Sequence, residues 1–202
     1  MVNVETYFEY GEVEMAHLSK KDKKLGAAIE RIGIIKRVVN PNLFSALVES
    51  VVGQQVSAKG AATVCRRLND LSGLDAARLH TLPQEEIRAC GMSMIKAGYI
   101  KNIADAAVNG IIDFDALPSK NDEEIIKELS SIKGVGVWTA EMLLIFSLMR
   151  PNIVSYGDLA IRRGMVNLYG LKEEPKKDKF LRYAKRYAPF GSVASLYLWE
   201  LS

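Results

Sequence analysis

One carboxylate in this sequence stands where chemistry is readily arranged, at the junction between a loop and a helix. Asp158 ends the loop P-N-I-V-S-Y-G and begins the pattern D-L-A-I-R-R, which is typical of a helix start. A carboxylate held at such a junction can stabilise a developing positive charge and can orient or deprotonate a water molecule. Asp is also a strong N-cap, and the residues by themselves favour this structural role over a catalytic one.

A second chemical feature is the turn K-G-V-G at residues 133–136, which lies between two helical patterns. Gly134 and Gly136 permit positive φ and a close approach to the backbone. The amides from Gly136 onward begin a new helix and would point toward a phosphate oxygen, and Lys133 adds a positive charge. The alternative is a tight connection between two packed helices, which the turn alone does not exclude.

Helical patterns surround both features. The apolar spacing, the capping residues and the Pro and Gly breaks predict helices over residues 20–33, 42–52, 58–68, 93–108, 125–129, 141–149, 159–168, 180–187 and 192–201. Ser19 and Ser57 are the expected N-caps of the first and third of these, and a short helix is expected after Pro83. Residues 1–16 fit either an extended arm or a short helix. With little strand signal, the pattern predicts an all-α fold.

Length and composition exclude several classes of protein. The chain has 202 residues, 49% of them hydrophobic, and a net charge of +3, which permits nucleic-acid binding without demanding it. No apolar run is long enough to span a bilayer, and the N-terminus lacks the pattern of a signal peptide, so we expect a cytoplasmic or nuclear protein rather than a secreted one. Cys65 and Cys90 are expected to be reduced core thiols, and His17 and His80 are far apart, so no catalytic metal is expected.

Four segments together carry a more specific signal. They are A-L-V-E-S-V-V-G-Q-Q-V-S-A-K-G-A (residues 46–61), L-S-S-I-K-G-V-G-V-W-T-A-E-M (129–142), I-V-S-Y-G-D-L-A-I-R-R-G (153–164) and Y-A-P-F-G-S-V-A-S-L-Y-L-W (187–199). With them the chain resembles the helix-hairpin-helix (HhH-GPD) DNA glycosylase superfamily, and most of all its AlkA-type 3-methyladenine DNA glycosylase II branch. The resemblance runs from roughly residue 17 to the C-terminus.

The resemblance places the superfamily's catalytic aspartate on Asp158, which reverses the preference for a simple N-cap. It implies hydrolysis of the N-glycosidic bond of alkylated purines, 3-methyladenine and also 7-methylguanine, in double-stranded DNA by base flipping. Relatives that also cut the strand carry a lysine nucleophile where this chain has Trp138. We therefore expect a monofunctional enzyme that leaves an abasic site.

The resemblance also implies a pocket for the extruded base. A methylated purine is cationic, and an aromatic wall attracts it by about 0.5–2 kcal/mol through cation–π interaction. The expected pocket residues are Trp138, Met142, Tyr156 and Phe190, with ordinary core packing as the alternative for each. The superfamily often has Trp at the position of Phe190 and Arg at that of Gly191, so the pocket departs from the pattern there.

DNA contacts are expected from the hairpin and from the segment G-Q-Q-V-S. Gln55 occupies the family's wedge position, where Leu is frequent, and an amide there can also bond to the orphaned base. The alternative is that Gln54 and Gln55 only cap backbone groups. The expected contacts to the DNA backbone are Lys133, Gly134, Gly136, Thr139, Ser57 and Lys59.

The implied architecture is one all-α glycosylase unit over residues 1–202, made of two helical lobes with a cleft between them. The lobes are residues 40–150, with the hairpin at 124–149, and residues 1–39 with 151–202. Longer relatives carry an N-terminal β-lobe, for which this chain has no room. We expect a monomer that binds damaged double-stranded DNA and no membrane, and no cofactor apart from a structural monovalent cation at the hairpin.

Other functions remain open at this stage. The chain fits a glycosylase for another lesion, such as 8-oxoguanine or a deaminated base. It also fits a non-catalytic helix-hairpin-helix DNA-binding protein, although the carboxylate after the hairpin argues against that. A helical protein-interaction domain is the third alternative.

Overall fold

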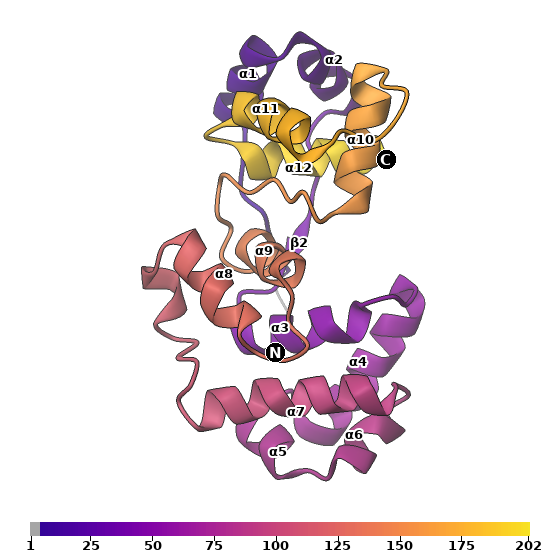
Figure 1. Cartoon of the computed structure of the whole chain (residues 1–202), viewed down its shortest axis with the longest axis vertical. Helices are drawn as coiled ribbons and strands as arrows, with labels where there is room; N and C mark the ends of the chain where they lie inside the picture. Colours follow the sequence, from indigo (N-terminus) through magenta and orange to yellow (C-terminus); the bar gives the residue numbers. More distant parts are fainter. Residues whose placement is uncertain (1–4) are drawn as a thin grey trace. The chain divides into compact units, whose positions relative to one another are not determined.

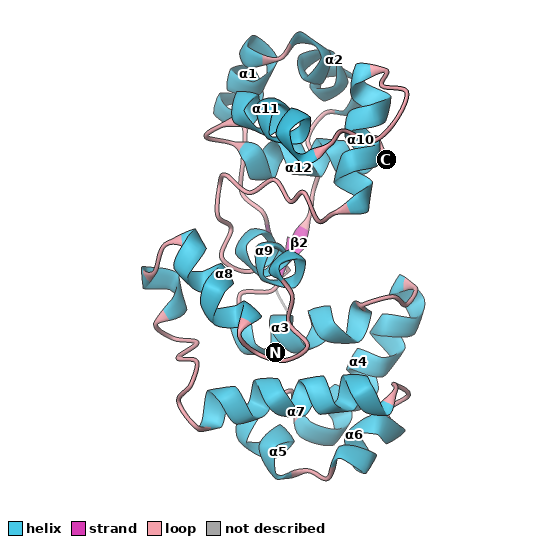
Figure 2. Cartoon of the chain, in the orientation of Figure 1, coloured by secondary structure: helices cyan, strands magenta, loops and turns pink. Residues whose placement is uncertain are grey.

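The computed structural model describes residues 5–202, and this part of the chain is mainly helical (Figure 1, Figure 2). The predicted all-α fold is confirmed. Its α-helices are α1 (Glu12–Lys21), α2 (Lys23–Ile32), α3 (Leu43–Gly53), α4 (Ala58–Ser72), α5 (Ala76–Thr81), α6 (Gln84–Ala89), α7 (Met94–Val108), α8 (Asp122–Ser130), α9 (Val137–Phe146), α10 (Leu159–Tyr169), α11 (Lys177–Tyr187) and α12 (Gly191–Glu200). No helix among the described residues is both long and apolar enough to cross a membrane.

The remaining elements are short. Strands β1 (Thr6–Tyr7) and β2 (Val38–Val39) pair antiparallel, and a 3-10 helix spans Leu117–Ser119. Of the ambiguous residues 1–16, the structure thus places a strand and the first part of α1, while residues 1–4 lie outside the described part.

The chain folds into two compact units. One comprises Met1–Val39 with Leu144–Ser202, and the other comprises Asn40–Leu143. The division falls inside α9, whereas the sequence analysis places it after residue 150. We refer to these as the terminal unit and the central unit, and we describe each by itself.

The prediction of one helix over residues 20–33, capped by Ser19, is wrong. Ser19 lies within α1, and the break between α1 and α2 occurs at Asp22, whose Oδ1 accepts from the amides of Lys24 and Leu25 at 3.1 Å each. The other carboxylate oxygen accepts from the Tyr169 hydroxyl at 2.7 Å. An aspartate that binds the amides ahead of it starts a new helix, and here a tertiary contact holds it in place.

Helix α9 also differs from its prediction. It begins at Val137, directly after the hairpin turn, and ends at Phe146, where residues 141–149 were expected. The chain leaves the helix because Met149 has a φ of +51° and the Arg150 amide turns back to the carbonyl of Leu144 at 2.8 Å. The apolar run that suggested a longer helix therefore includes a turn. The sequence analysis missed helix α5, which Asp75 caps, because this helix has only six residues.

The central unit is organised around α7. This helix buries Ala97, Ile100, Ile103, Ala104 and Ala106 and packs against α3, α5 and α6 (Figure 1). Its Lys101 ammonium donates to three carbonyls at the end of α5, those of Leu79 (3.4 Å), His80 and Leu82 (3.1 Å). A single cation thus satisfies carbonyls that α5 cannot bond internally.

In the terminal unit, α10 and α12 pack at very close range. Residues Gly191 to Leu198 of α12 are all buried. A Cβ on Gly164 of α10 would lie 2.0 Å from the carbonyl oxygen of Leu198, so only glycine allows this approach. Asp158 is the N-cap of the same helix α10.

We expect Gly164→Ala to lower the free energy of unfolding by about 1–3 kcal/mol or more, because α10 and α12 must separate to admit the methyl group. Urea denaturation followed by circular dichroism measures this loss. Gly53→Ala is the matched control: a Cβ there meets nothing within 4 Å, so a change below about 0.5 kcal/mol is expected. Wild-type stability in Gly164→Ala would contradict the close packing.

Candidate functional site

Asp158 is a buried N-cap, 7% exposed. Its Oδ1 accepts from the amide of Ile161 at 2.9 Å, and the backbone of Asp158 has the extended conformation that an N-cap requires. The positive end of the α10 dipole lies next to the carboxylate, which is a favourable interaction for a negative charge. The N-cap role and a chemical role are therefore compatible: the cap holds the carboxylate in one orientation.

The loop that carries Asp158 is fastened to the start of α12. Ser192 Oγ accepts from the amide of Ile153 at 3.0 Å and donates to the carbonyl of Arg150 at 2.5 Å. The Ser195 hydroxyl donates to the carbonyl of Ile153 at 2.9 Å. The sequence analysis missed both serines, although two serines three positions apart in an otherwise apolar helix are a usable signal. They hold the loop on a buried, well-packed helix.

Arg162 supports the same loop from the other side. Its Nη1 donates to the Tyr156 carbonyl at 2.6 Å and its Nε donates to Glu174 at 2.8 Å. The guanidinium carbon lies 5.4 Å from the centre of the Tyr156 ring. The Tyr156 ring also meets the edge of Phe180, with centroids 5.2 Å apart. Arg162 therefore makes its contacts within the protein.

Phe190 lies at the start of α12, where its ring packs edge-to-face on His17 with centroids 5.2 Å apart. The next residue, Gly191, has no room for a side chain: a Cβ would lie 2.8 Å from Val154 and 2.9 Å from the Asn152 side chain. The superfamily often has Arg at this position, whereas Gly191 here allows a close contact between α12 and the loop that carries Asp158.

The hairpin turn, residues 131–136, connects α8 to α9 in the central unit. Gly134 has a φ of +106°, and a Cβ there would lie 2.2 Å from the Tyr99 ring of α7, so glycine is required. Gly136 has no positive φ, and a Cβ on it would meet nothing within 4 Å. Across the described residues, the amides of Gly134 and Gly136 find no acceptor in the chain. They are therefore available to an external oxygen.

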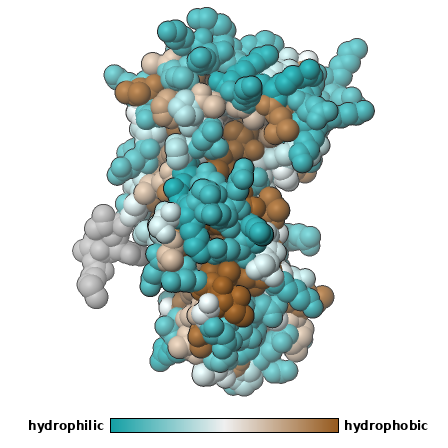
Figure 3. Space-filling view, turned by 60° about the vertical axis from the view of Figure 1, so that its left-hand side comes forward, coloured by the Kyte–Doolittle hydropathy of each residue, from teal (hydrophilic) through white to brown (hydrophobic). Residues whose placement is uncertain are grey.

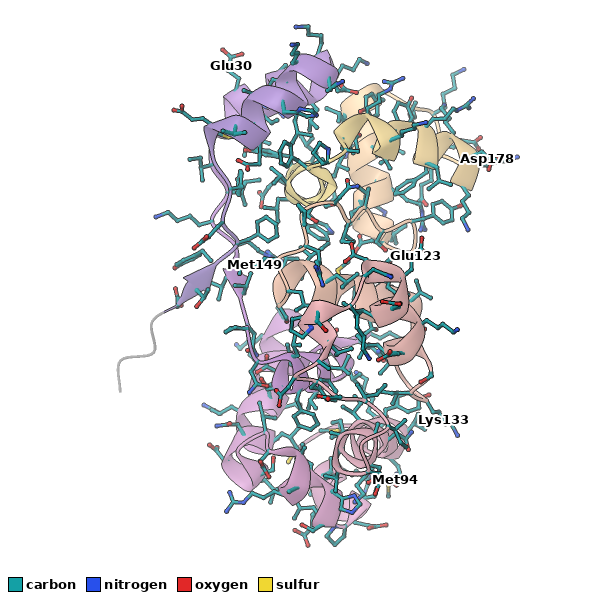
Figure 4. All side chains as sticks on the ribbon, turned by 90° about the vertical axis from the view of Figure 1, so that its left-hand side faces the viewer. Glu30, Met94, Glu123, Lys133, Met149 and Asp178 are labelled. Carbon is teal, nitrogen blue, oxygen red and sulfur yellow. The ribbon has the colours of Figure 1, made fainter. Side chains whose placement is uncertain are left out.

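Protein groups hold the carbonyls of this turn. Ile132 accepts from the amide of Val135 at 3.0 Å, Lys133 from the Asn102 side chain at 3.0 Å, and Gly134 from the Gln54 side chain at 3.3 Å. These bonds tie the turn to Asn102 of α7 and to the Gln54 side chain. Lys133 itself is exposed, and its side chain projects from the turn (Figure 4).

The segment after α3 forms a strained loop, residues 54–56. Gln55 is exposed with a φ of +57°, a conformation that costs a non-glycine residue free energy, and Val56 beside it is 49% exposed. The Gln54 side chain donates to Gly134 O and to Thr139 Oγ1, both at 3.3 Å. Gln54 therefore ties the 54–56 loop to the hairpin, which leaves Gln55 as the side chain directed outward.

The remaining predicted residues of the central unit differ in exposure. Trp138 is 37% exposed and begins α9, whereas Met142 is 7% exposed and Thr139 is 2% exposed. Because the Thr139 hydroxyl already accepts from Gln54, its role in the structure is to join α9 to the 54–56 loop. Ser57 is the N-cap of α4, accepting from Gly60 at 3.2 Å, and Lys59 is exposed beside it.

The structure thus gathers the predicted residues in two groups. Asp158, Tyr156 and Phe190 belong to the terminal unit, where α12 holds the aspartate loop. Trp138, Met142, the hairpin turn and the 54–56 loop belong to the central unit, where α7 supports them. The face shown in Figure 3 is mostly hydrophilic, with hydrophobic residues gathered in separate patches.

Other reactive groups offer no competing site. Among the described residues no cluster of His, Cys, Asp and Glu is suited to hold a metal ion. Both cysteines are free thiols, and burial, aided by the charge of Glu49, raises the pKa of Cys65 to about 11. A thiol with so high a pKa is a poor nucleophile at neutral pH.

Comparison with known proteins gives consistent results. The family described as HhH-GPD superfamily base excision DNA repair protein matches residues 48–189. The chain is 32% identical over 196 residues to DNA-3-methyladenine glycosylase 1 of Schizosaccharomyces pombe, covering 95% of this chain and 86% of that protein.

Two solved structures are similar over most of their length. The S. pombe 3-methyladenine DNA glycosylase in complex with abasic DNA has a TM-score of 0.84 and 32% identity, covering 94% of this chain and 96% of that one. A DNA-3-methyladenine glycosidase from Bacillus halodurans has a TM-score of 0.84 and 36% identity, covering 96% and 91% respectively.

The double role of Asp158 yields a test on stability alone. Asp158→Ala should lower the free energy of unfolding by about 1 kcal/mol, whereas Asp158→Asn, which keeps the N-cap, should stay within about 0.5 kcal/mol of wild type. Urea denaturation compares the two variants. Equal losses in both would show that the charge, rather than the cap hydrogen bond, holds this helix start.

Proposed function

Because the chain belongs to the HhH-GPD superfamily of base excision DNA repair proteins, we propose that it is a DNA glycosylase for alkylated purines in double-stranded DNA. The substrates are 3-methyladenine and 7-methylguanine. The observation that carries this proposal is the buried Asp158 carboxylate, held in one orientation by its own helix and by a loop fastened to α12. The names of the similar proteins support the choice of lesion.

The proposed reaction breaks the bond between C1′ of the sugar and the purine nitrogen. Positive charge develops on the sugar, and the Asp158 carboxylate stabilises it. Asp158 also orients a water molecule and accepts its proton as the oxygen bonds to C1′. An alkylated purine is cationic and leaves as a neutral base, so no group has to protonate it. The product is an abasic site in an uncut strand.

Trp138 supports the monofunctional assignment. A glycosylase that also cleaves the strand needs an amine to attack C1′, and this position offers an indole instead. The partly exposed ring is suited to a cationic base by cation–π interaction. We propose Tyr156, Phe190 and Met142 as further residues that bind the base. Tyr156 and Phe190 are half-buried aromatic rings held by Arg162 and His17, and Met142 lies one turn from Trp138.

We propose that the hairpin and the 54–56 loop hold the DNA. The amides of Gly134 and Gly136 and the charge of Lys133 would bind phosphate oxygens, with Ser57, Lys59 and the backbone of Thr139 as further contacts. The absence of any steric need for glycine at 136 agrees with a close approach by the DNA backbone. Gln55 would fill the gap left by the flipped nucleotide, and Gln54 would keep the loop on the hairpin. The enzyme would act as a monomer, and the mechanism requires no cofactor.

The deciding experiment measures release of free base from methylated duplex DNA, with chromatographic identification and an alkali step to reveal abasic sites. Wild type should release 3-methyladenine and leave strands that break only after alkali. Asp158→Asn should lose at least about 100-fold in rate, the lower end of what a positioned acid or base contributes. It should bind abasic duplex at least as well as wild type, since a negative charge near the DNA is removed.

Each other outcome changes a specific part of the proposal. Strand breakage without alkali would overturn the monofunctional assignment, and undiminished activity in Asp158→Asn would overturn the role of the carboxylate. DNA binding without release of any methylated base would move the proposal to 8-oxoguanine or deaminated bases. Failure with those as well would leave a non-catalytic DNA-binding protein, and absent or salt-insensitive binding would point to a protein-interaction domain.

A further inference from the structure

Both loops that the proposed function brings to the DNA are fastened to one helix. Lys96, Tyr99 and Asn102 are spaced by three residues on α7 and so lie along one face of it. Tyr99 packs against the hairpin at Gly134, and Asn102 donates to the carbonyl of Lys133 at 3.0 Å. Lys96 contacts the 54–56 loop. Neither core packing nor the family motifs explain why Lys96 binds this loop.

Lys96 binds the end of α3 and the first residue of the loop. Its ammonium donates to the carbonyl of Val52 at 2.9 Å and to the carbonyl of Gln54. Burial lowers the pKa of Lys96, in keeping with an ammonium drawn partly out of water. Beside it lies a cavity of about 280 Å³, whose wall includes Gln55, Val56 and Met92. The ammonium therefore lies directly beneath the loop.

The loop needs such support because its own bonds are weak. The backbone of Gln55 is in the left-handed region, which persists in a non-glycine residue only when the surroundings hold it. The backbone bonds next to it are long, from Gln54 N to Val51 O at 3.3 Å and from Val56 N to Gly53 O at 3.4 Å. The Gln54 side-chain bonds are 3.3 Å each. Lys96 adds a charge-assisted hydrogen bond to this loop, from its ammonium to the carbonyl of Gln54.

We propose that Lys96 is a positioning residue that holds the 54–56 loop so that Gln55 enters the DNA stack when the nucleotide rotates out. This inference rests on the proposed function, because it needs Gln55 to act as the wedge. The bound side chain does not touch the reacting atoms. Lys96 fixes the position of Gln55 before DNA binds. Binding energy is then not spent on ordering the loop and is available for base flipping.

The competing explanation is that Lys96 only caps α3. The same helix provides a matched control, because Lys101 caps α5 in the same way, through the carbonyls of Leu79, His80 and Leu82. Both lysines are partly buried on α7, and each loses its carbonyl contacts on substitution by Met while its aliphatic length is kept. Only Lys96 contacts the wedge loop. A purely structural role predicts the same behaviour from both variants.

The test uses the full chain and a duplex with a tetrahydrofuran abasic-site analogue opposite 2-aminopurine, whose fluorescence reports the stacking of the orphaned base. Wild type should change this fluorescence on binding, and Gln55→Ala should not. Lys96→Met should lose at least about half of the change at saturating protein, and Lys101→Met should keep it. Urea denaturation of both lysine variants shows whether their stabilities match.

A rate measurement tests the same point on the lesion. With 7-methylguanine paired to cytosine, Lys96→Met should lower the single-turnover rate by about tenfold, because the cost of extrusion is no longer offset by the wedge. With 7-methylguanine opposite an abasic-site analogue the loss should fall below about threefold, because an unpaired base is extruded at lower cost. Lys101→Met should be close to wild type on both substrates. A structural defect would slow both substrates alike.

The outcomes separate this inference from the proposed function. A wild-type fluorescence change and rate in Lys96→Met would overturn it, as would equal losses in Lys96→Met and Lys101→Met. A wild-type fluorescence change in Gln55→Ala would contradict both the wedge role of Gln55 and the positioning role of Lys96, even if the protein releases methylated bases. The fluorescence assay needs no excision, so it decides the role of Lys96 even if alkylated purines are not the substrate. If Lys96→Met does not fold, Lys96→Gln, whose single amide can serve one carbonyl, should show an intermediate loss, and a wild-type response from it would overturn the inference.

Discussion

Every α-helix ends in amides and carbonyls that its own hydrogen bonds cannot satisfy, and in an almost wholly helical chain these ends are numerous. Some of the groups that satisfy these ends, and some amides that stay free, are proposed to act on DNA or to hold the parts that do. Asp158 completes the start of α10, the free amides at Gly134 and Gly136 precede α9, and Lys96 completes the end of α3. Function and helix termination therefore draw on the same few side chains.

Holding such ends in place requires helices that approach one another closely. Gly164 lets the backbone of α12 lie against α10, Gly191 lets α12 meet the loop before Asp158, and Gly134 lets the hairpin meet Tyr99. Each contact excludes even a methyl group. Close packing of this kind is hardly compressible, so the carboxylate and the hairpin turn are each held in place by the unit that carries them.

The chemistry proposed for this framework is modest. A cationic purine is already a good leaving group, so one carboxylate and an aromatic wall suffice where a neutral base would need an acid. Discrimination then comes from charge, through cation–π attraction, and from the lower stacking and pairing cost of a damaged base. Arg162 and Ser192 contribute by holding the loop around Asp158 and its neighbour Tyr156.

The sequence by itself determined the all-α fold, most helix starts and the residues of the motifs, because caps, glycine turns and apolar periodicity act within a few neighbouring residues. Ser57 and Asp158 are N-caps as the local pattern indicates. The break at Asp22 was missed because a contact with Tyr169, far along the chain, stabilises it. The same holds for the supports of the site: Ser192, Tyr99 and Lys96 act on residues about 35 or more positions away, and no local pattern reveals such partners. Only the tertiary structure decided that Gln54 is tied to the hairpin while Gln55 faces outward, because two adjacent glutamines differ only in what the folded chain places beside them.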